Sequence, residues 1–85
     1  MFYTYILFSK TTNKYYCSST DNIERRISQH NSGYSKSTKG GLQWELKYFE
    51  EYSDRSEAVR RENEIKKKKS RKYIEGLISN GERPE

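Results

Sequence analysis

Residues 2–18 read FYTYILFSKTTNKYYCS, and this stretch decides how the chain begins to fold. Aromatic and β-branched side chains crowd residues 2–8, which is typical of a β-strand. The polar residues 9–13 favour a turn, and residues 15–18 predict a second, short strand. We expect the two strands to pair antiparallel as a hairpin.

The segment that follows the hairpin predicts a helix. Asp21, followed three residues later by Glu24, is a variant of the capping box and marks the expected helix start. Ile23 and Ile27 repeat at the spacing of one helical turn, so both are expected to face the sheet. Gly33 is a natural stop for this helix.

A loop and a third strand are predicted next. Residues 34–41 are small, polar and basic, which favours a loop. Residues 43–52 return to strand alternation, with Trp44, Leu46 and Tyr48 expected on one face.

Two further helices complete the predicted fold. Ser56 opens the first of them, and Ser70 is expected to cap a shorter one with an apolar stripe. Residues 80–85 are expected to fray. The sequence therefore predicts an α/β (α+β) domain of order ββαβαα over residues 1–79, with a three-stranded antiparallel sheet flanked by helices.

Composition narrows the classes of function. The 85 residues suffice for one core, and 17 basic against 12 acidic side chains give a net charge of +5. Such a balance favours a polyanionic partner. The single cysteine, Cys17, and the single histidine, His30, exclude an internal disulfide and a zinc site built on cysteine or histidine clusters. No run approaches the about 20 apolar residues of a membrane span, and no signal peptide is visible, so a cytoplasmic location is expected.

Arg26 and His30 lie one helical turn apart and border the apolar stripe of the first helix. Each has an ordinary interpretation. Arg26 is then an arginine whose aliphatic stem covers apolar surface, and His30 is a histidine at the helix C-terminus that interacts favourably with the helix dipole. Together on one face they form a candidate site. Arg25, the neighbour, is expected to point to solvent.

Glu62 interrupts the apolar face of the following helix. Ala58, Glu62 and Ile65 are spaced at i, i+4 and i+7, so the carboxylate falls within the stripe. A glutamate there is costly to desolvate unless it is paired or binds a cation. It is either a glutamate at the stripe edge with its head in water, or a ligand for Mg²⁺, which prefers carboxylate oxygens and keeps several waters.

Two tyrosines and a basic track are the remaining candidates. Antiparallel hairpin geometry can bring the hydroxyls of Tyr5 and Tyr16 close together on one sheet face. Basic side chains in the loop and the later helices form a plausible phosphate track, against the ordinary interpretation of a solvated helix face. The candidate nucleic-acid contacts are Lys36, Lys39, Arg60, Arg61, Lys66, Lys67, Lys68 and Lys69.

Over residues 3–78 the chain resembles the small stand-alone members of the GIY-YIG nuclease family. The first family motif falls on Tyr3-Thr4-Tyr5 and the second on Tyr16-Cys17-Ser18. The residues that match the family's functional positions are Tyr5, Tyr16, Arg26, His30 and Glu62. Tyr3 and Ser18 stand where the motifs have glycine, Cys17 where the second has an apolar residue, and Asn80 is the nearest candidate for the family's late asparagine.

The resemblance implies a metal-dependent DNA endonuclease that hydrolyses phosphodiester bonds. Glu62 would then hold Mg²⁺ or Mn²⁺, and Arg26 would bind the scissile phosphate. Tyr5, acidified by nearby cations, would deprotonate the attacking water with help from Tyr16 or His30. The implied substrate is duplex or branched DNA, with RNA as a further candidate, and structure-selective cleavage in DNA repair or processing is one expectation.

Two other functions remain open at this stage. The fold could serve as a nucleic-acid-binding module that does not cut, an alternative that gains from Cys17 and Ser18 in the second motif. It could also serve as a small structural or interaction protein whose aromatic faces are interfaces. Metal-dependent cleavage separates the first function from both alternatives.

Overall fold

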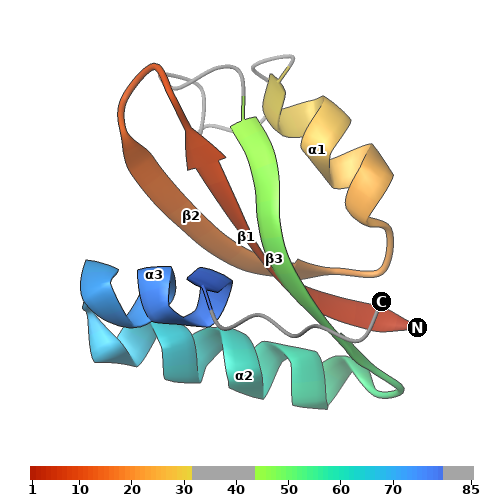
Figure 1. Ribbon diagram of the computed structural model, residues 1–85. Coiled ribbons are helices and arrows are strands. Elements are labelled where there is room, and N and C mark those ends of the chain that lie inside the picture. The colour runs from red at the N-terminus through yellow and green to blue at the C-terminus, as the bar shows by residue number, and fades with distance from the viewer. Residues whose placement is uncertain (32–43, 80–85) are drawn as a thin grey trace.

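The computed structural model describes residues 1–31 and 44–79, and its elements follow the predicted order ββαβαα (Figure 1). The elements are β1 (Phe2–Ser9), β2 (Lys14–Thr20), α1 (Ile23–Asn31), β3 (Trp44–Tyr52), α2 (Arg55–Lys68) and α3 (Arg71–Ser79). The predicted α+β class is thereby confirmed. The expected loop at 34–41 and the expected frayed tail at 80–85 lie outside the described residues.

The three strands form one antiparallel sheet in the order β2-β1-β3. β1 is the central strand, so its aromatic and β-branched side chains are covered on both faces. Helix α1 covers one face, and α2 and α3 cover the other (Figure 1). Residues 4–7 of β1 are at most 1% exposed.

Alternation along β1 divides the core into two clusters. Tyr5 and Leu7 point toward α1 and pack with Trp44, while Ile6 points toward α2 and packs with Cys17. Each layer of helix therefore packs on its own set of side chains from the same strand. The sheet edge at β2 is the place where groups from the two helical layers can approach one another.

The prediction that Trp44, Leu46 and Tyr48 share one face of the third strand is wrong, because β3 contains a bulge. Ile6 pairs with Tyr48 but Leu7 pairs with Leu46, which leaves Lys47 as an extra residue. One extra residue reverses the side-chain alternation. As a result Trp44 packs in the α1 cluster and Tyr48 in the α2 cluster, and Leu46 is 36% exposed.

The helix ends differ from expectation in one case and agree in another. Asn22, rather than Asp21, caps α1, because its Oδ1 accepts the backbone N–H of Arg25 at 3.0 Å. Ser70 caps α3 as predicted, accepting the N–H of Tyr73 at 3.1 Å. Between the helices, Lys69 adopts a left-handed conformation (φ 48°) that ends α2 and turns the chain toward α3.

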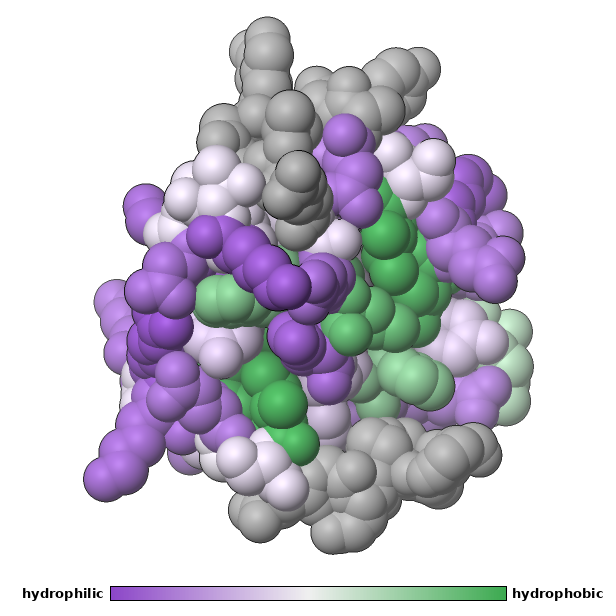
Figure 2. All heavy atoms as spheres, turned by 45° about the horizontal axis from the view of Figure 1, so that its top comes forward, coloured by the Kyte–Doolittle hydropathy of each residue, from purple (hydrophilic) through white to green (hydrophobic). Residues whose placement is uncertain are grey.

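The surface seen in Figure 2 carries apolar side chains as separate patches set among hydrophilic ones. Within residues 1–31 and 44–79, every helix is too short or too polar to cross a membrane.

Candidate functional site

Tyr5 and His30 form a buried pair between the sheet and α1. Both residues are fully buried, and the Tyr5 hydroxyl lies 3.1 Å from His30 Nε2. Tyr16 joins them on the same face, with its ring edge-on to the imidazole at a centroid distance of 5.1 Å. The pairing of Tyr5 with Ser18 and of Leu7 with Tyr16 explains this, because it places the two tyrosines on one face.

Burial changes the protonation chemistry of this pair. It raises the pKa of Tyr5 above its ordinary value of 10.0, although hydrogen bonds from Arg26 and Ser18 and the charge of Arg26 act in the opposite direction. The expected acidification of Tyr5 is therefore wrong, because desolvation outweighs the nearby cation. Burial, with a smaller contribution from the Arg26 charge, lowers the pKa of His30 to about 4. His30 is neutral at pH 7, which also removes its ordinary interpretation as a charged helix-end histidine.

A pH-dependent stability follows for His30. Its pKa of about 4 in the folded state lies below the ordinary 6.5, so the unfolded chain takes up the proton first as the pH falls. The stabilisation is complete above pH 6.5 and is lost toward pH 4, with about 2 kcal/mol gone between pH 7 and pH 5. Urea unfolding at the two pH values measures this loss. His30→Gln should remove most of the difference, and an equal loss in both proteins would contradict the assignment.

Arg26 lies at the outer edge of this face. Its Nη1 donates to Gln29 Oε1 at 2.6 Å, and its guanidinium reaches the Tyr5 phenol. It also lines a cavity of about 340 Å³ together with Ser19 and Arg55. Arg25 lines the same cavity, but it is exposed and paired with Asp21 at 2.7 Å.

Glu62 lies on the other side of the sheet, in α2. Its side chain is 14% exposed, and the carboxylate accepts the Ser19 hydroxyl at 2.7 Å on Oε1 and Lys66 Nζ at 2.6 Å on Oε2. The predicted position within the apolar stripe thus places this carboxylate against the edge strand β2. Its charge is compensated there by a lysine and a hydroxyl.

Strand β2 connects the two halves of the candidate site. Ser19 lines the cavity that holds Arg26 and donates its hydroxyl to Glu62. Tyr16 and Lys66 line a second cavity farther along the same strand. The five predicted site residues therefore surround one strand edge, with Tyr5 and His30 buried behind it, rather than lining one common cavity.

The family model for the "GIY-YIG catalytic domain" matches residues 1–74. The chain belongs to the GIY-YIG family. This GIY-YIG protein is 46% identical over 65 residues to the UPF0213 protein of Staphylococcus haemolyticus, a match that covers 75% of the chain and 78% of the relative. It is 38% identical over 65 residues to the UPF0213 protein of Natronomonas pharaonis, covering 75% of each.

A solved structure supports the fold of this GIY-YIG domain. The solution NMR structure of the UPF0213 protein from Bacillus halodurans matches with a TM-score of 0.57 and 36% sequence identity, over 93% of this chain and 84% of the other. The names of these relatives state no activity. The GIY-YIG domain points to nuclease-like chemistry, and the relatives place this protein among small UPF0213 members.

The two departures in the second GIY-YIG motif have different structural roles. Cys17 is 7% exposed and packs against Ile6 and Ile65, so it replaces one apolar residue by another. Burial, followed by the charge of Glu62, raises the pKa of its thiol to about 12, which makes it unreactive. Ser18 lies opposite Tyr5 in the sheet and adds a hydroxyl beside its phenol.

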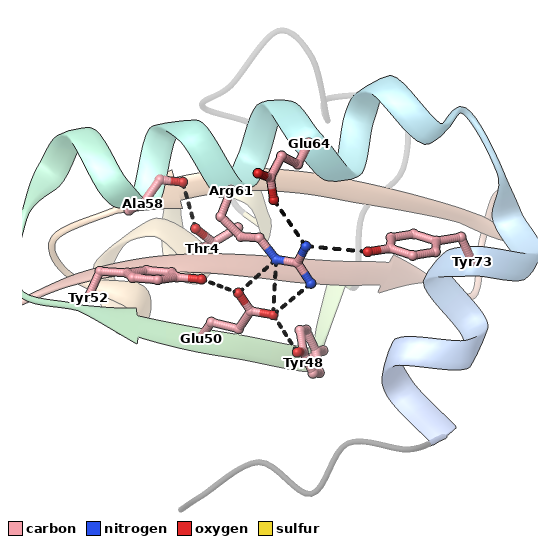
Figure 3. A network of polar contacts seen from close by, with 8 residues as sticks. All are labelled: Thr4, Tyr48, Glu50, Tyr52, Ala58, Arg61, Glu64 and Tyr73. Atoms are coloured by element: carbon pink, nitrogen blue, oxygen red, sulfur yellow. Dashed lines mark hydrogen bonds and ion pairs between the residues drawn. The ribbon is translucent and has the colours of Figure 1, made fainter.

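Arg61 occupies a different place from the rest of the predicted basic track. Its guanidinium makes a bidentate ion pair with Glu50, with the closest contact at 2.9 Å, and also contacts Glu64 and Tyr73 (Figure 3). Burial acts to raise the pKa of Glu50, but Arg61 and the hydroxyls of neighbouring tyrosines hold it below its ordinary value. Arg61 therefore fixes α2 to β3. The other described members of the track, Arg60, Lys66, Lys67, Lys68 and Lys69, are exposed.

Removing this ion pair should destabilise the domain. Glu50→Gln removes the closest anionic partner of the half-buried Arg61 and leaves it only the exposed Glu64. We expect a loss of about 2 kcal/mol in the free energy of unfolding. Glu45→Gln is the matched control on the same strand, because Glu45 pairs with Lys10 and Lys47 in solvent. It should cost less than about 1 kcal/mol. Equal losses in urea unfolding would show that the Glu50 pair is no more than a surface contact.

Two residues of the candidate site, Ser19 and Arg55, were not identified from the sequence. Ser19 carries no signal beyond its place next to the second motif, since its partner Glu62 is 43 positions away. Arg55 could have been considered as the first residue of α2, where it lines the Arg26 cavity. Lys36, Lys39 and Asn80 lie outside the described residues.

Proposed function

We propose that this GIY-YIG protein is a metal-dependent endonuclease that hydrolyses phosphodiester bonds in DNA. The observation that carries the proposal is the arrangement at Ser19, which joins the cavity of Arg26 to the carboxylate of Glu62. Arg26, which can bind a phosphate, and Glu62, which can bind a divalent ion, thus both lie at the β2 edge of the sheet. We favour structure-selective cleavage as the activity and DNA repair or processing as its biological setting.

Glu62 suits a divalent ion as a single protein ligand. Within residues 1–31 and 44–79, no cluster of three or more histidine, cysteine or acidic side chains could enclose a metal. Mg²⁺ often needs only one or two carboxylates and completes its shell with waters and substrate phosphate. The Glu62 carboxylate has lone pairs beyond those used by Ser19 and Lys66. A bound Mg²⁺ or Mn²⁺ would neutralise charge on the phosphate and ease departure of the leaving oxygen.

The other residues have roles that follow from their burial. Arg26 borders a cavity and would bind the scissile phosphate and stabilise its developing charge. Tyr16 is partly exposed whereas Tyr5 is buried, so we assign the contact with an attacking water to Tyr16. Tyr5 and His30 are buried, and we assign them to holding the Tyr16 ring and the Arg26 guanidinium in place.

The second candidate function is a nucleic-acid-binding module that does not cut. Two observations favour it: Lys66 already neutralises Glu62, and the pKa of Tyr5 is raised rather than lowered. A structural or interaction protein is the third candidate. It predicts that loss of the Glu62 charge affects neither binding nor any reaction.

The test that separates these functions is nicking of supercoiled plasmid and cleavage of branched DNA. We expect cleavage in the presence of Mg²⁺ or Mn²⁺ that stops when EDTA is added. Salt-dependent DNA binding without any cleavage would establish the binding module instead.

A further inference from the structure

A second cavity lies between β2 and the α2–α3 corner and has a volume of about 430 Å³. We call it the β2–α3 cavity. Cys17, Ile65 and Ile74 are its apolar lining residues, together with Tyr15, and Tyr16 borders it from the edge strand β2. The volume falls in the range of about 300–1,000 Å³ that is typical of small-molecule pockets.

The rim of this cavity is cationic. Among the described residues that line it, none is acidic and the basic ones are Lys14, Lys66, Lys69 and Arg71. Lys66 pairs with Glu62 and Arg71 pairs with Glu75. Within residues 1–31 and 44–79, Lys14 and Lys69 make no ion pair, so their charges are open to a ligand.

The charge of Arg71 is held at a defined place. Its guanidinium lies over the Tyr15 ring at 5.0 Å from the centroid. It also donates to the backbone oxygen of Asn13 at 2.9 Å and to Asn13 Oδ1 at 3.1 Å. These contacts fix the β1–β2 turn to α3, so the mouth of the cavity is preorganised.

The cavity adjoins the proposed catalytic edge. Lys66 lines the β2–α3 cavity and donates to Glu62 at 2.6 Å. Tyr16 borders the same cavity and contacts His30 of the candidate site. A nucleic-acid strand that passes Glu62 would therefore continue over this cavity.

We propose that the β2–α3 cavity takes an unpaired nucleotide of the DNA substrate, with its base against the apolar lining residues and its phosphates on the cationic rim. This inference rests on the proposed function for its ligand class. Paired bases are stacked inside a duplex and do not present their faces to a pocket, whereas unpaired bases do. The substrate is accordingly DNA with single-stranded nucleotides beside the cut.

The test is binding of fluorescein-labelled DNA in EDTA, measured by anisotropy. One probe is a blunt duplex, and the other is the same duplex with a short single-stranded thymidine extension. We expect the extension to tighten binding about tenfold, and an extension of abasic units to lose most of that gain. Equal binding of blunt and extended probes, or a full gain with abasic units, would overturn the inference.

A pair of double variants assigns the preference to the cavity. Lys14→Gln with Lys69→Gln should reduce the gain from the extension to less than about twofold, because the rim charges are lost. Lys10→Gln with Lys47→Gln removes the same charge from exposed lysines that pair with Glu45, and should preserve the gain. An equal reduction in both variants would contradict the proposal.

The binding test is independent of catalysis because EDTA is present throughout. A preference for the extension in a protein that never cleaves would retain the cavity inference and remove the nuclease proposal. Cleavage by a protein that binds blunt and extended probes equally would retain the nuclease proposal and remove the cavity inference.

Discussion

Glu62→Gln should lower metal-dependent cleavage by at least about a hundredfold while DNA binding does not weaken. The amide keeps the shape of the side chain and can still accept the Ser19 hydroxyl, which lies 2.7 Å from Oε1. It removes the negative charge that a divalent ion requires. Single-turnover cleavage rates and anisotropy binding curves measure the two effects separately.

The matched control is Glu64→Gln on the same helix. The Glu64 side chain is 55% exposed and pairs with Arg61, away from β2. Glu64→Gln should leave the cleavage rate within about twofold of the wild-type value, since exposed ion pairs contribute little. A similar fall in both variants would mean that helix charge in general, and not Glu62, controls the reaction.

Arg26→Ala should abolish detectable cleavage, because loss of a preorganised charge contact in the transition state costs about 3–4 kcal/mol. Arg25→Ala should weaken binding only slightly. Both arginines line the same cavity, but Arg25 is exposed and paired with Asp21 at 2.7 Å. Equal losses of cleavage in the two variants would contradict the assignment.

Arg26 also has a signature that does not depend on activity. Its charge contributes to the lowered pKa of His30 and offsets part of the rise that burial causes in the pKa of Tyr5. In Arg26→Ala the pKa of His30 should therefore rise, and the imidazole resonances followed by NMR should titrate at higher pH than in the wild type. Arg25→Ala should leave that titration in place, which separates local electrostatics from a general loss of structure.

The fold was predictable from the sequence to the extent that its signals are local. Alternation and capping in neighbouring residues predicted all six elements in order, and Ser70 was correctly identified as a cap. The faces of β3 were not predictable, because the bulge at Lys47 is defined by how β3 pairs with β1. Asn22 replaced Asp21 as cap because adjacent residues compete for the same backbone N–H groups.

The spacing along each element was predictable for the candidate residues, but the electrostatics of the site were not. Helical spacing predicted Arg26 beside the sheet and Glu62 within an apolar stripe; in the structure Arg26 lines a cavity with Ser19, and the Glu62 side chain is 14% exposed. The raised pKa of Tyr5 depends on the covering by α1, and the pairing of Arg61 with Glu50 joins two layers. Such contacts depend on tertiary packing, which no local pattern encodes.

The most direct measurement is cleavage by the wild-type protein of duplex, branched and single-stranded DNA and of RNA. Each substrate is incubated with Mg²⁺ or Mn²⁺ and, in a parallel sample, with EDTA. The proposed function predicts metal-dependent hydrolysis of at least one DNA substrate, and the cavity inference adds that cleavage is fastest where unpaired nucleotides adjoin a duplex. No cleavage of any substrate with either metal, by protein that still binds DNA, would contradict it.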